Sequence, residues 1–444
     1  MADVQPFYGL RYNPERIGDL SAVITPPYDV ISTAEQLIYY RSSPYNVIRL
    51  EYGEERPDDS PQDNRYTRAA LTLEHWLSQG MLTREQRPAF YLVEHRFTYQ
   101  GSTRSRFSLL ARVRLEALSG DGGIRPHEMT MRKPGEDRLR LLQSCRANFS
   151  PVMGLFHHHG EGVQSLFPDA MDRPALNAVD RNGVTYAMWV ITDEKDTARV
   201  SDFFANKTLY IADGHHRYET ALAYQKEQRS LRTAHTGDEA FNFVMMTLTS
   251  AGDPNLIMLP THRLVRGINP ERLAQLKRER SAYFDEEFLP PSSIPSQTLE
   301  GWMQTLNEQL VTAFGLYGLD GDHLCLLRAR PGMIPTIQPD VLQHLDVNVL
   351  HQVVLRQMLG IDSPEREEEC LEYTREGLEA ISRVDAGEYQ LAILLNPTPI
   401  SSIMAVADQG VRMPQKSTYF HPKTPTGLVI NPLWDDLSQS ADPK

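Results

Sequence analysis

One stretch, KTLYIADGHHRYETALAY at residues 207–224, constrains the fold more than any other. Residues 208–212 form a short apolar run that suits a buried strand. An Asp-Gly pair ends this run, and Gly214 can adopt backbone conformations that other residues avoid. The pattern that follows is helical. The stretch therefore predicts a strand, a sharp turn and a helix that begins near His216 or Arg217.

The residues of this turn suit an anion. A helix that begins here presents free backbone N–H groups and the positive end of its dipole. Arg217 can hold a phosphate with two N–H groups, and His215 and His216 can donate to phosphate oxygens or carry a proton near neutral pH. Adjacent histidines point in different directions, which disfavours one metal ion bound by both. We predict phosphate binding, and a structural turn or a metal site stay open as alternatives.

A second cluster lies in GGIRPHEMTMRKPGEDRLRLLQ at residues 122–143. His127 and Glu128 stand beside several cations, among them Lys133 and Arg138, and precede a predicted helix. A His-Glu pair near cations can supply a general base and the charge that restrains it. The alternative is a solvated loop with an acidic residue near the start of the helix.

A third cluster lies in MPQKSTYFHPKTPTGLVINPL at residues 413–433. Lys416, Ser417, Thr418 and Lys423 bring hydroxyl and ammonium groups into a loop that prolines interrupt. The segment lacks the GxxxxGK[ST] pattern and so is not a P-loop. The alternative is an ordinary turn region.

The composition narrows the class of protein. The chain has 444 residues, 41% of them hydrophobic, and a formal net charge of −13, which disfavours broad binding of nucleic acid or anionic membrane. We identify no apolar run of the roughly 18 residues that span a bilayer and no signal peptide. The three cysteines lie far apart without CxxC spacing. We expect a soluble, cytoplasmic protein without a nucleic-acid or membrane partner, and the oligomeric state stays open.

Strand and helix patterns are interspersed without a regular βαβ alternation, which predicts an α+β fold with mixed sheets. The expected strands are 46–52, 89–99, 108–115, 241–249 and 390–396, and the expected helices are 64–80, 217–229 and 347–360. We expect an N-terminal α+β region (1–160), a region carrying the turn (161–288) and a C-terminal α+β region (298–444), or one compact unit.

Seven blocks in order resemble a widespread bacterial and archaeal family of conserved domains of unknown function, from about residue 5 to residue 433. They are PFYGLRYNP, TPPYDVIS, PYNVIRLEYGE, IRPHEMT with EDRLRLL and ANFSPVMGLF, LYIADGHHRYETAL, LPTHRLV, and MPQKSTYFHPKTPTGL. This resemblance implies that the chain is related to members of that family, and it implies no particular activity.

The DGHHR turn and its helix are also similar to the phosphate-binding turn of the ParB/sulfiredoxin-like superfamily, which includes free-serine kinases. That resemblance implies nucleotide phosphates held by Gly214, His215, His216 and Arg217. Sulfiredoxin chemistry needs a cysteine in the turn, where this chain has histidine. The acidic net charge disfavours a ParB-like role in DNA partitioning.

Together, these patterns lead us to expect a nucleotide-dependent, kinase-like phosphotransferase that acts on a small molecule, with free serine as the superfamily's example. It would use Mg²⁺ and a nucleoside di- or triphosphate such as ATP or ADP. The expected catalytic residues are Glu128 as general base with His127, and Asp213 as a ligand of Mg²⁺ or a partner that orients His215. The expected phosphate or nucleotide ligands are Gly214, His216, Arg217, Lys133, Arg138, Lys416, Ser417, Thr418 and Lys423.

This mechanism assumes that the three clusters meet at one site. Two other classes of protein remain open. One is a metal-assisted phosphatase or nucleotidase that uses Asp213, His215 and His216. The other is a non-catalytic sensor of a nucleotide or metabolite.

Overall fold

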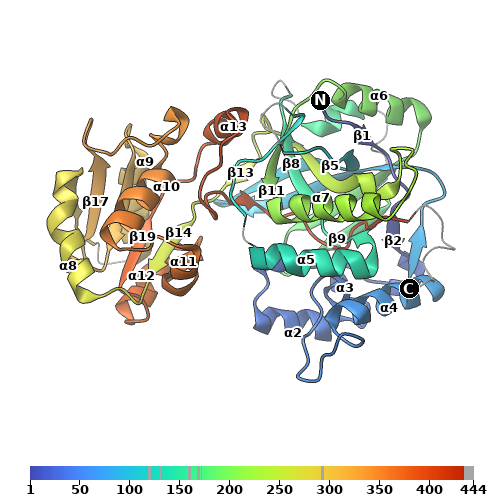
Figure 1. The fold of residues 1–444 in the computed structure, drawn as a ribbon, viewed down its shortest axis with the longest axis horizontal. Helices are drawn as coiled ribbons and strands as arrows, with labels where there is room; N and C mark the ends of the chain where they lie inside the picture. Colours follow the sequence, from blue (N-terminus) through green and yellow to red (C-terminus); the bar gives the residue numbers. More distant parts are fainter. Residues whose placement is uncertain are drawn as a thin grey trace. The chain divides into compact units, whose positions relative to one another are not determined.

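The computed structural model describes residues 1–118, 122–130, 132–158, 162–167, 171, 173–291 and 295–434, with the side chains of 132–134 outside this description (Figure 1). The chain divides into two compact units. Unit 1 comprises Met1–Pro126, Thr130–Ile257 and Pro422–Lys444, and unit 2 comprises His127–Met129 and Met258–His421. These boundaries do not coincide with those of the three expected regions, which stay a prediction.

Unit 1 is built on a nine-stranded mixed sheet in the order β6-β11-β8-β12-β5-β4-β10-β9, with β1 paired to β5. Strand β11 runs antiparallel to β8 and parallel to β6, so it continues the sheet close to one edge. The strands are β1 (Val4–Gln5), β4 (Phe90–Tyr99), β5 (Ser102–Arg114), β6 (Ile124–Arg125), β8 (Val152–Phe156), β9 (Leu176–Val179), β10 (Thr185–Ile191), β11 (Leu209–Asp213) and β12 (Phe243–Ser250).

Helices cover both faces of this sheet. Side chains of α4 (Arg65–Ser78) and α5 (Arg132–Cys145) join the core on one face, and side chains of α6 (Glu194–Phe204) and α7 (His215–Ser230) join the core on the other. Helices α5 and α7 lie side by side, where Leu142 packs with Tyr224 (Figure 1). The helices α2 (Thr33–Ser42) and α3 (Ile48–Glu51) belong to the same unit.

Burial on both faces explains the continuous apolar runs of the central strands. In β4, Phe90 and Leu92 pack into one core, whereas Tyr91 and Val93 pack into the other. Successive side chains of a strand point to opposite faces, so a strand covered on both sides reads as an unbroken apolar run.

Unit 2 contains a six-stranded sheet in the order β15-β17-β16-β19-β14-β18. Its strands are β14 (His262–Val265), β15 (Phe284–Leu289), β16 (Ala313–Tyr317), β17 (Leu324–Ala329), β18 (Leu371–Thr374) and β19 (Leu391–Leu394). Its helices include α8 (Pro270–Glu279), α9 (Pro295–Asn307), α10 (Asp346–Val349), a π-helix (Leu350–Met358), α11 (Pro364–Cys370), α12 (Gly377–Asp385) and α13 (Ile400–Asp408).

The α+β class is confirmed, with a mixed sheet in unit 1 and an antiparallel sheet in unit 2. The strands expected at 89–99, 108–115 and 390–396 and the helices expected at 64–80 and 217–229 are confirmed as well. The strand expected at 241–249 begins at Phe243, after a 3₁₀ turn at Ala240–Asn242. The helix expected at 347–360 is a short α-helix continued by the π-helix.

The strand expected at 46–52 is wrong, because Ile48–Glu51 form the short helix α3. Asn46, which precedes the N-cap residue Val47, accepts a hydrogen bond from the backbone N of Ile48 at 2.9 Å, and its amide donates to the carbonyl of Ala22 at 2.8 Å. The apolar residues of the run are fully buried, so no periodicity distinguished a helix from a strand.

None of the helices in the described part of the chain is both long and apolar enough to cross a lipid bilayer.

Asp346 in unit 2 gives a prediction about pH. Burial raises the pKa of Asp346 to about 7 from 3.8, and a hydrogen bond from the backbone N of Ala313 opposes this shift. The pKa of Asp346 is higher in the folded protein than in the unfolded chain. Protonated Asp346 therefore contributes its full stability below the unfolded pKa, and this contribution is lost as pH rises through about 7. We expect Asp346→Asn to raise the free energy of unfolding at pH 8 by about 2 kcal/mol, a figure reduced for partial exposure.

The measurement is the thermal midpoint of both proteins between pH 4 and pH 8. The two midpoints should coincide at pH 4 and separate as the pH rises. An equal difference at both ends would contradict the assignment to Asp346.

Candidate functional site

The turn between β11 and α7 has the predicted form. Strand β11 ends at Asp213, Gly214 has a left-handed φ of 86°, and α7 begins at His215, close to the expected start. A Cβ atom on Gly214 would lie 2.8 Å from Nε of Arg217. Glycine is therefore required both by the backbone conformation and by the close approach of the Arg217 side chain.

Gly214→Ala is accordingly expected to lower the free energy of unfolding by roughly 2–4 kcal/mol, from backbone strain and from the clash with Arg217. Gly237→Ala is the matched control, because Gly237 has a φ of 89° and its added Cβ would meet no atom within 4 Å. Urea unfolding should show a clearly larger loss for Gly214→Ala. Equal losses would mean that only backbone strain acts at the turn.

Asp213 is held between two cations. Its Oδ2 lies 2.7 Å from Nη2 of Arg217, and its Oδ1 pairs with Nζ of Lys423. Arg217 also donates from Nη1 to the carbonyl of Pro151. The side chains of Arg217 and Lys423 are nearly buried, with exposed fractions of 8% and 9%. The arginine predicted to bind phosphate is thus engaged by a carboxylate of its own chain.

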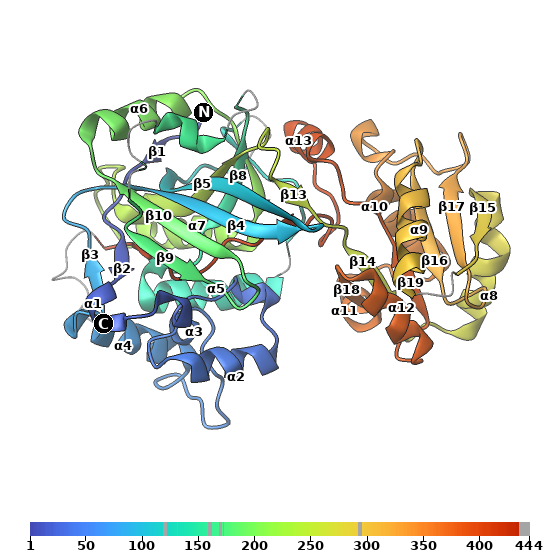
Figure 2. The same ribbon diagram turned by 180° about the vertical axis from the view of Figure 1, so that it is seen from behind.

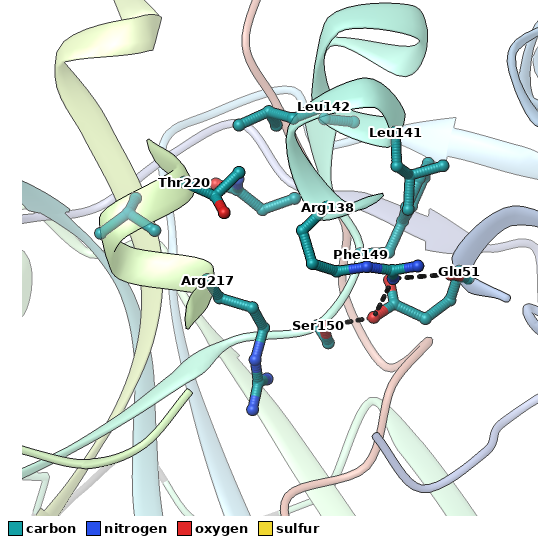
Figure 3. A pocket seen from close by; sticks show the side chains of 11 residues that line it. Glu51, Arg138, Leu141, Leu142, Phe149, Ser150, Arg217 and Thr220 are labelled. Carbon is teal, nitrogen blue, oxygen red and sulfur yellow. Dashed lines mark hydrogen bonds and ion pairs between the residues drawn. The ribbon is translucent and has the colours of Figure 1, made fainter. Parts of the chain in front are cut away.

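A second ion pair lies beside this one in unit 1. Nη1 of Arg138 donates to the backbone carbonyl of Glu51 at 2.8 Å and lies 3.4 Å from Glu51 Oε1, which also accepts from Ser150 Oγ at 2.7 Å (Figure 3). The guanidinium of Arg138 stacks over the ring of Tyr28, 3.9 Å from its centroid. Glu51 and Arg138 are only 3% and 6% exposed.

Asp137 connects this pair to α4. It accepts from Nε of Arg138 and from the hydroxyl of Tyr66, both at 2.7 Å, and pairs with Arg65. We call the combined group the buried charge cluster, and define it as Tyr28, Glu51, Asp137, Arg138, Ser150, Asp213, Arg217 and Lys423.

A cavity of about 40 Å³ borders the buried charge cluster, and Glu51, Arg138, Ser150 and Arg217 are among the residues that line it. Arg138 reaches it from α5 and Arg217 and Thr220 reach it from α7 (Figure 3). This volume holds water but is far below the roughly 300 Å³ at which pockets for drug-sized ligands begin. A nucleotide would therefore need the surrounding side chains to rearrange.

Electrostatics keep the arginines charged. Burial lowers the pKa of Arg138, but Glu51 and Asp137 more than offset this, so its pKa is raised. Burial likewise lowers the pKa of Arg217, and Asp213 and Asp29 reverse the effect. Burial raises the pKa of Glu51, against the attraction of Arg138. The cluster therefore presents permanent cations with carboxylates that balance them.

Three buried hydroxyls of unit 1 come from the motifs TPPYDVIS and HPKTPTGL. Backbone bonds join Thr25 and Thr426, with N···O distances of 3.2 and 2.7 Å. The hydroxyls of Thr25, Thr424 and Thr426 are buried and have no hydrogen-bond partner within the described residues. Buried hydroxyls usually have a partner, so water or a ligand is expected to bind there.

Five other predicted residues gather in unit 2. Nε2 of His127 lies 3.1 Å from Thr418 Oγ1. The carboxylate of Glu128 accepts from the backbone N of Lys416 at 2.9 Å and from Thr418 Oγ1 at 3.4 Å. Ser417 donates from Oγ to the carbonyl of Pro414 at 2.6 Å.

The predicted site residues thus fall into two groups, one in each unit. Unit 1 brings together Arg138, Asp213, Arg217 and Lys423 around the turn, and unit 2 brings together His127, Glu128, Lys416 and Thr418. His215 is buried and His216 is half-buried, both in the first turn of α7. The side chain of Lys133 lies outside the described residues. A single site built from all of them stays a prediction.

Sequence reasoning missed Tyr28, Glu51 and Ser150. A signal was present, since Tyr28 and Glu51 lie in the TPPYDVIS and PYNVIRLEYGE blocks and Ser150 lies in ANFSPVMGLF. Among the described residues, no group of three or more His, Cys, Asp or Glu side chains could hold a metal ion. A Mg²⁺ ligand role for Asp213 stays a prediction.

Residues 4–348 match the model of a family described as "Protein of unknown function (DUF1015)", and the chain belongs to this family. No curated protein matches the chain.

Several solved structures are similar at low identity. A conserved hypothetical protein from Pyrococcus furiosus is 13% identical, with 68% of this chain and 90% of that chain covered and a TM-score of 0.33. A free serine kinase in complex with AMP is 12% identical, with 67% and 83% covered and a TM-score of 0.33. SbnI with a C-terminal truncation, from Staphylococcus aureus, is 12% identical, with 74% and 92% covered and a TM-score of 0.34. Likenesses this distant carry no argument about activity.

Proposed function

We propose that the chain binds the phosphates of a nucleotide at the β11–α7 turn of unit 1 and transfers a phosphoryl group to a small molecule. The observation that carries this proposal is the gathering of Arg138, Arg217 and Lys423, three nearly buried cations, at and beside the N-terminus of a 16-residue helix. Phosphoryl transfer depends on positioning and on neutralising the charge of the phosphates, and such a cluster supplies both.

The carboxylate of Asp213 forms ion pairs with Arg217 and Lys423, so it holds the position that we propose for the phosphate. A phosphate carries more charge than one carboxylate and can accept from both cations at once. The same phosphate would also accept hydrogen bonds from backbone N–H groups at the start of α7, because the N-cap residue Gly214 has no side chain that could accept them. Binding would therefore exchange Asp213 for phosphate at these two cations.

The exchange would release the carboxylate of Asp213. One or two carboxylates together with substrate phosphates are the usual ligands of Mg²⁺ at nucleotide sites. In this proposal Asp213 holds Mg²⁺ only with nucleotide present. The metal would neutralise the phosphates and orient them. ATP and ADP are the nucleotides proposed.

A thermal-shift comparison tests nucleotide binding. ATP or ADP with Mg²⁺ is expected to raise the thermal midpoint of the wild type, since a ligand that binds only the folded state stabilises it by mass action. At a nucleotide concentration about 100 times Kd, the stabilisation is about 2.7 kcal/mol. AMP should give a smaller shift, because it lacks the further phosphates. Equal midpoints with and without every nucleotide would contradict the proposal.

Glu128 is the proposed general base for the acceptor hydroxyl, with free serine as the proposed acceptor. Glu128→Gln preserves shape and hydrogen-bond acceptance but removes basicity. We expect it to lower the rate of transfer by roughly 100-fold or more, which is the range of general-base contributions, and to leave the nucleotide thermal shift unchanged. Glu136→Gln, a substitution in α5, is the control. An undiminished rate in Glu128→Gln would exclude this role.

A metal-assisted phosphatase that holds its metal without a substrate is less well supported, since no group of three or more His, Cys, Asp or Glu side chains that could hold a metal ion occurs among the described residues. Such an enzyme would also release phosphate without any acceptor.

A further inference from the structure

A cavity of about 250 Å³ lies in unit 1 away from the buried charge cluster. Most of its lining residues lie on β4, β9 and β10, which are the last three strands in the sheet order and lie next to one another in Figure 2. We call it the β4–β10 cavity; it is lined by Glu94, Arg96, Pro174, Asn177, Thr185, Ala187 and Trp189.

The strand register explains how these side chains meet. Arg96 pairs with Thr185, and Glu94 pairs with Ala187, which in turn pairs with Asn177 on β9. Paired residues, and residues two apart along a strand, share one face of a sheet. This is the face on which Phe90 and Leu92 enter the core. Toward the end of β4 the same face becomes polar and leaves a hollow.

Trp189 lines the β4–β10 cavity and carries a hydrogen-bond donor that is not satisfied among the described residues. Its side chain is mostly buried, with 7% of the residue exposed, and its ring lies 6.4 Å from that of Phe107. The indole N–H is buried and has no hydrogen-bond partner in the part of the chain that the structure describes. A buried donor without a partner destabilises the fold, and an acceptor atom of a ligand inside the cavity would remove this penalty.

The cavity carries one charge of each sign. Glu94 is 9% exposed and accepts from Arg96 Nη2 at 3.1 and 3.2 Å and from the hydroxyl of Ser105. The side chain of Arg96 is 57% exposed, so its guanidinium can move toward a ligand. A carboxylate and a guanidinium side by side complement a ligand that carries an ammonium and a carboxylate.

We propose that the β4–β10 cavity binds a free amino acid or a similar small zwitterion. The ligand carboxylate would accept from Arg96 and from the Trp189 indole N–H. The ligand ammonium would donate to Glu94. A volume of about 250 Å³ is below the range of drug-sized pockets and suits a ligand of this size.

This site is distinct from the proposed phosphate turn. Strands β8, β12, β5 and β4 separate β11 from β10, and at about 4.8 Å per spacing the two strands lie roughly 24 Å apart. A zwitterion held here would not reach a phosphoryl group at the turn. The cavity would act as a second, regulatory site, and its occupancy does not depend on the proposed function.

The test is tryptophan fluorescence of the full chain, titrated with each of the twenty standard L-amino acids up to about 10 mM, roughly tenfold above a millimolar Kd. At least one amino acid should change the emission saturably. Trp189→Phe, which keeps a ring but removes the N–H donor, should abolish the change, and Trp302→Phe in unit 2 should retain it.

Calorimetry on the same proteins tests the recognition of charge. Glu94→Gln and Arg96→Gln are each expected to weaken binding at least tenfold, and the N-acetylated form of the best amino acid, which lacks the ammonium, should not bind. The side chain of Arg96 is more than half exposed, so we expect Arg96→Gln to fold. This variant therefore still tests the site if Trp189→Phe does not fold. The proposal is overturned if no amino acid binds, or if binding survives both charge substitutions.

Discussion

Replacing Arg217 with alanine is expected to weaken the binding of ATP or ADP by about 100-fold. Arg217 is nearly buried at the start of α7, and its guanidinium already holds the carboxylate of Asp213. A charged hydrogen bond contributes about 1.5–3 kcal/mol, so the loss of a guanidinium that makes one or two such bonds to phosphate corresponds to roughly 10- to 100-fold or more in Kd. The measurement is Kd by calorimetry, together with the nucleotide-dependent thermal shift.

Lys226→Ala is the matched control for this substitution. Lys226 lies in the same helix and carries the same charge, but it is exposed. We expect it to leave nucleotide affinity close to that of the wild type. An Arg217→Ala protein that is folded and binds nucleotide as tightly as the Lys226→Ala protein would contradict the phosphate site at the turn.

Replacing Arg138 with methionine is expected to lower the free energy of unfolding by about 3–5 kcal/mol at pH 7. The substitution keeps an apolar stem but leaves the carboxylate of Glu51, which is 3% exposed, without its cation. Removing one partner of a buried ion pair strands the other charge, and this cost exceeds the net contribution of the pair. Urea unfolding followed by circular dichroism measures the loss.

Two comparisons distinguish the unpaired carboxylate of Glu51 from lost packing as the cause of the destabilisation. The double variant Glu51→Gln, Arg138→Met should recover part of the loss, because no buried charge is left unpaired at this position. The loss should also shrink toward pH 5. Burial raises the pKa of Glu51, so its protonated form stabilises the fold at low pH, and this stabilisation is lost as pH rises. A strictly additive double variant with no pH dependence would show that packing alone is responsible.

Local features were predictable from the sequence. The strand, the glycine turn and the helix at residues 207–224 depend on neighbouring residues, and the structure places them within one or two residues of the prediction. The run at 46–52 was not predictable in this way, because Val47, Ile48 and Leu50 are all fully buried and so show no periodicity that separates a helix from a strand.

The partners of the site could not be predicted from local sequence. Glu51 meets Arg138 across 87 residues and Lys423 meets Asp213 across 210, and no spacing rule operates over such separations. The sequence indicated Arg138, Asp213, Arg217 and Lys423 as candidate site residues, and their role in binding a nucleotide stays a prediction. That carboxylates of the same chain balance these cations is a property of the fold alone.

The most direct test of the central claim is to incubate the wild type with Mg²⁺, ATP or ADP and a panel of hydroxyl-bearing metabolites that includes free serine, and to identify products by mass spectrometry. We predict a phosphorylated metabolite whose formation requires both nucleotide and acceptor and is lost in Arg217→Ala. Release of inorganic phosphate at the same rate without an acceptor, or nucleotide binding with no product from any metabolite, would contradict phosphoryl transfer at the β11–α7 turn.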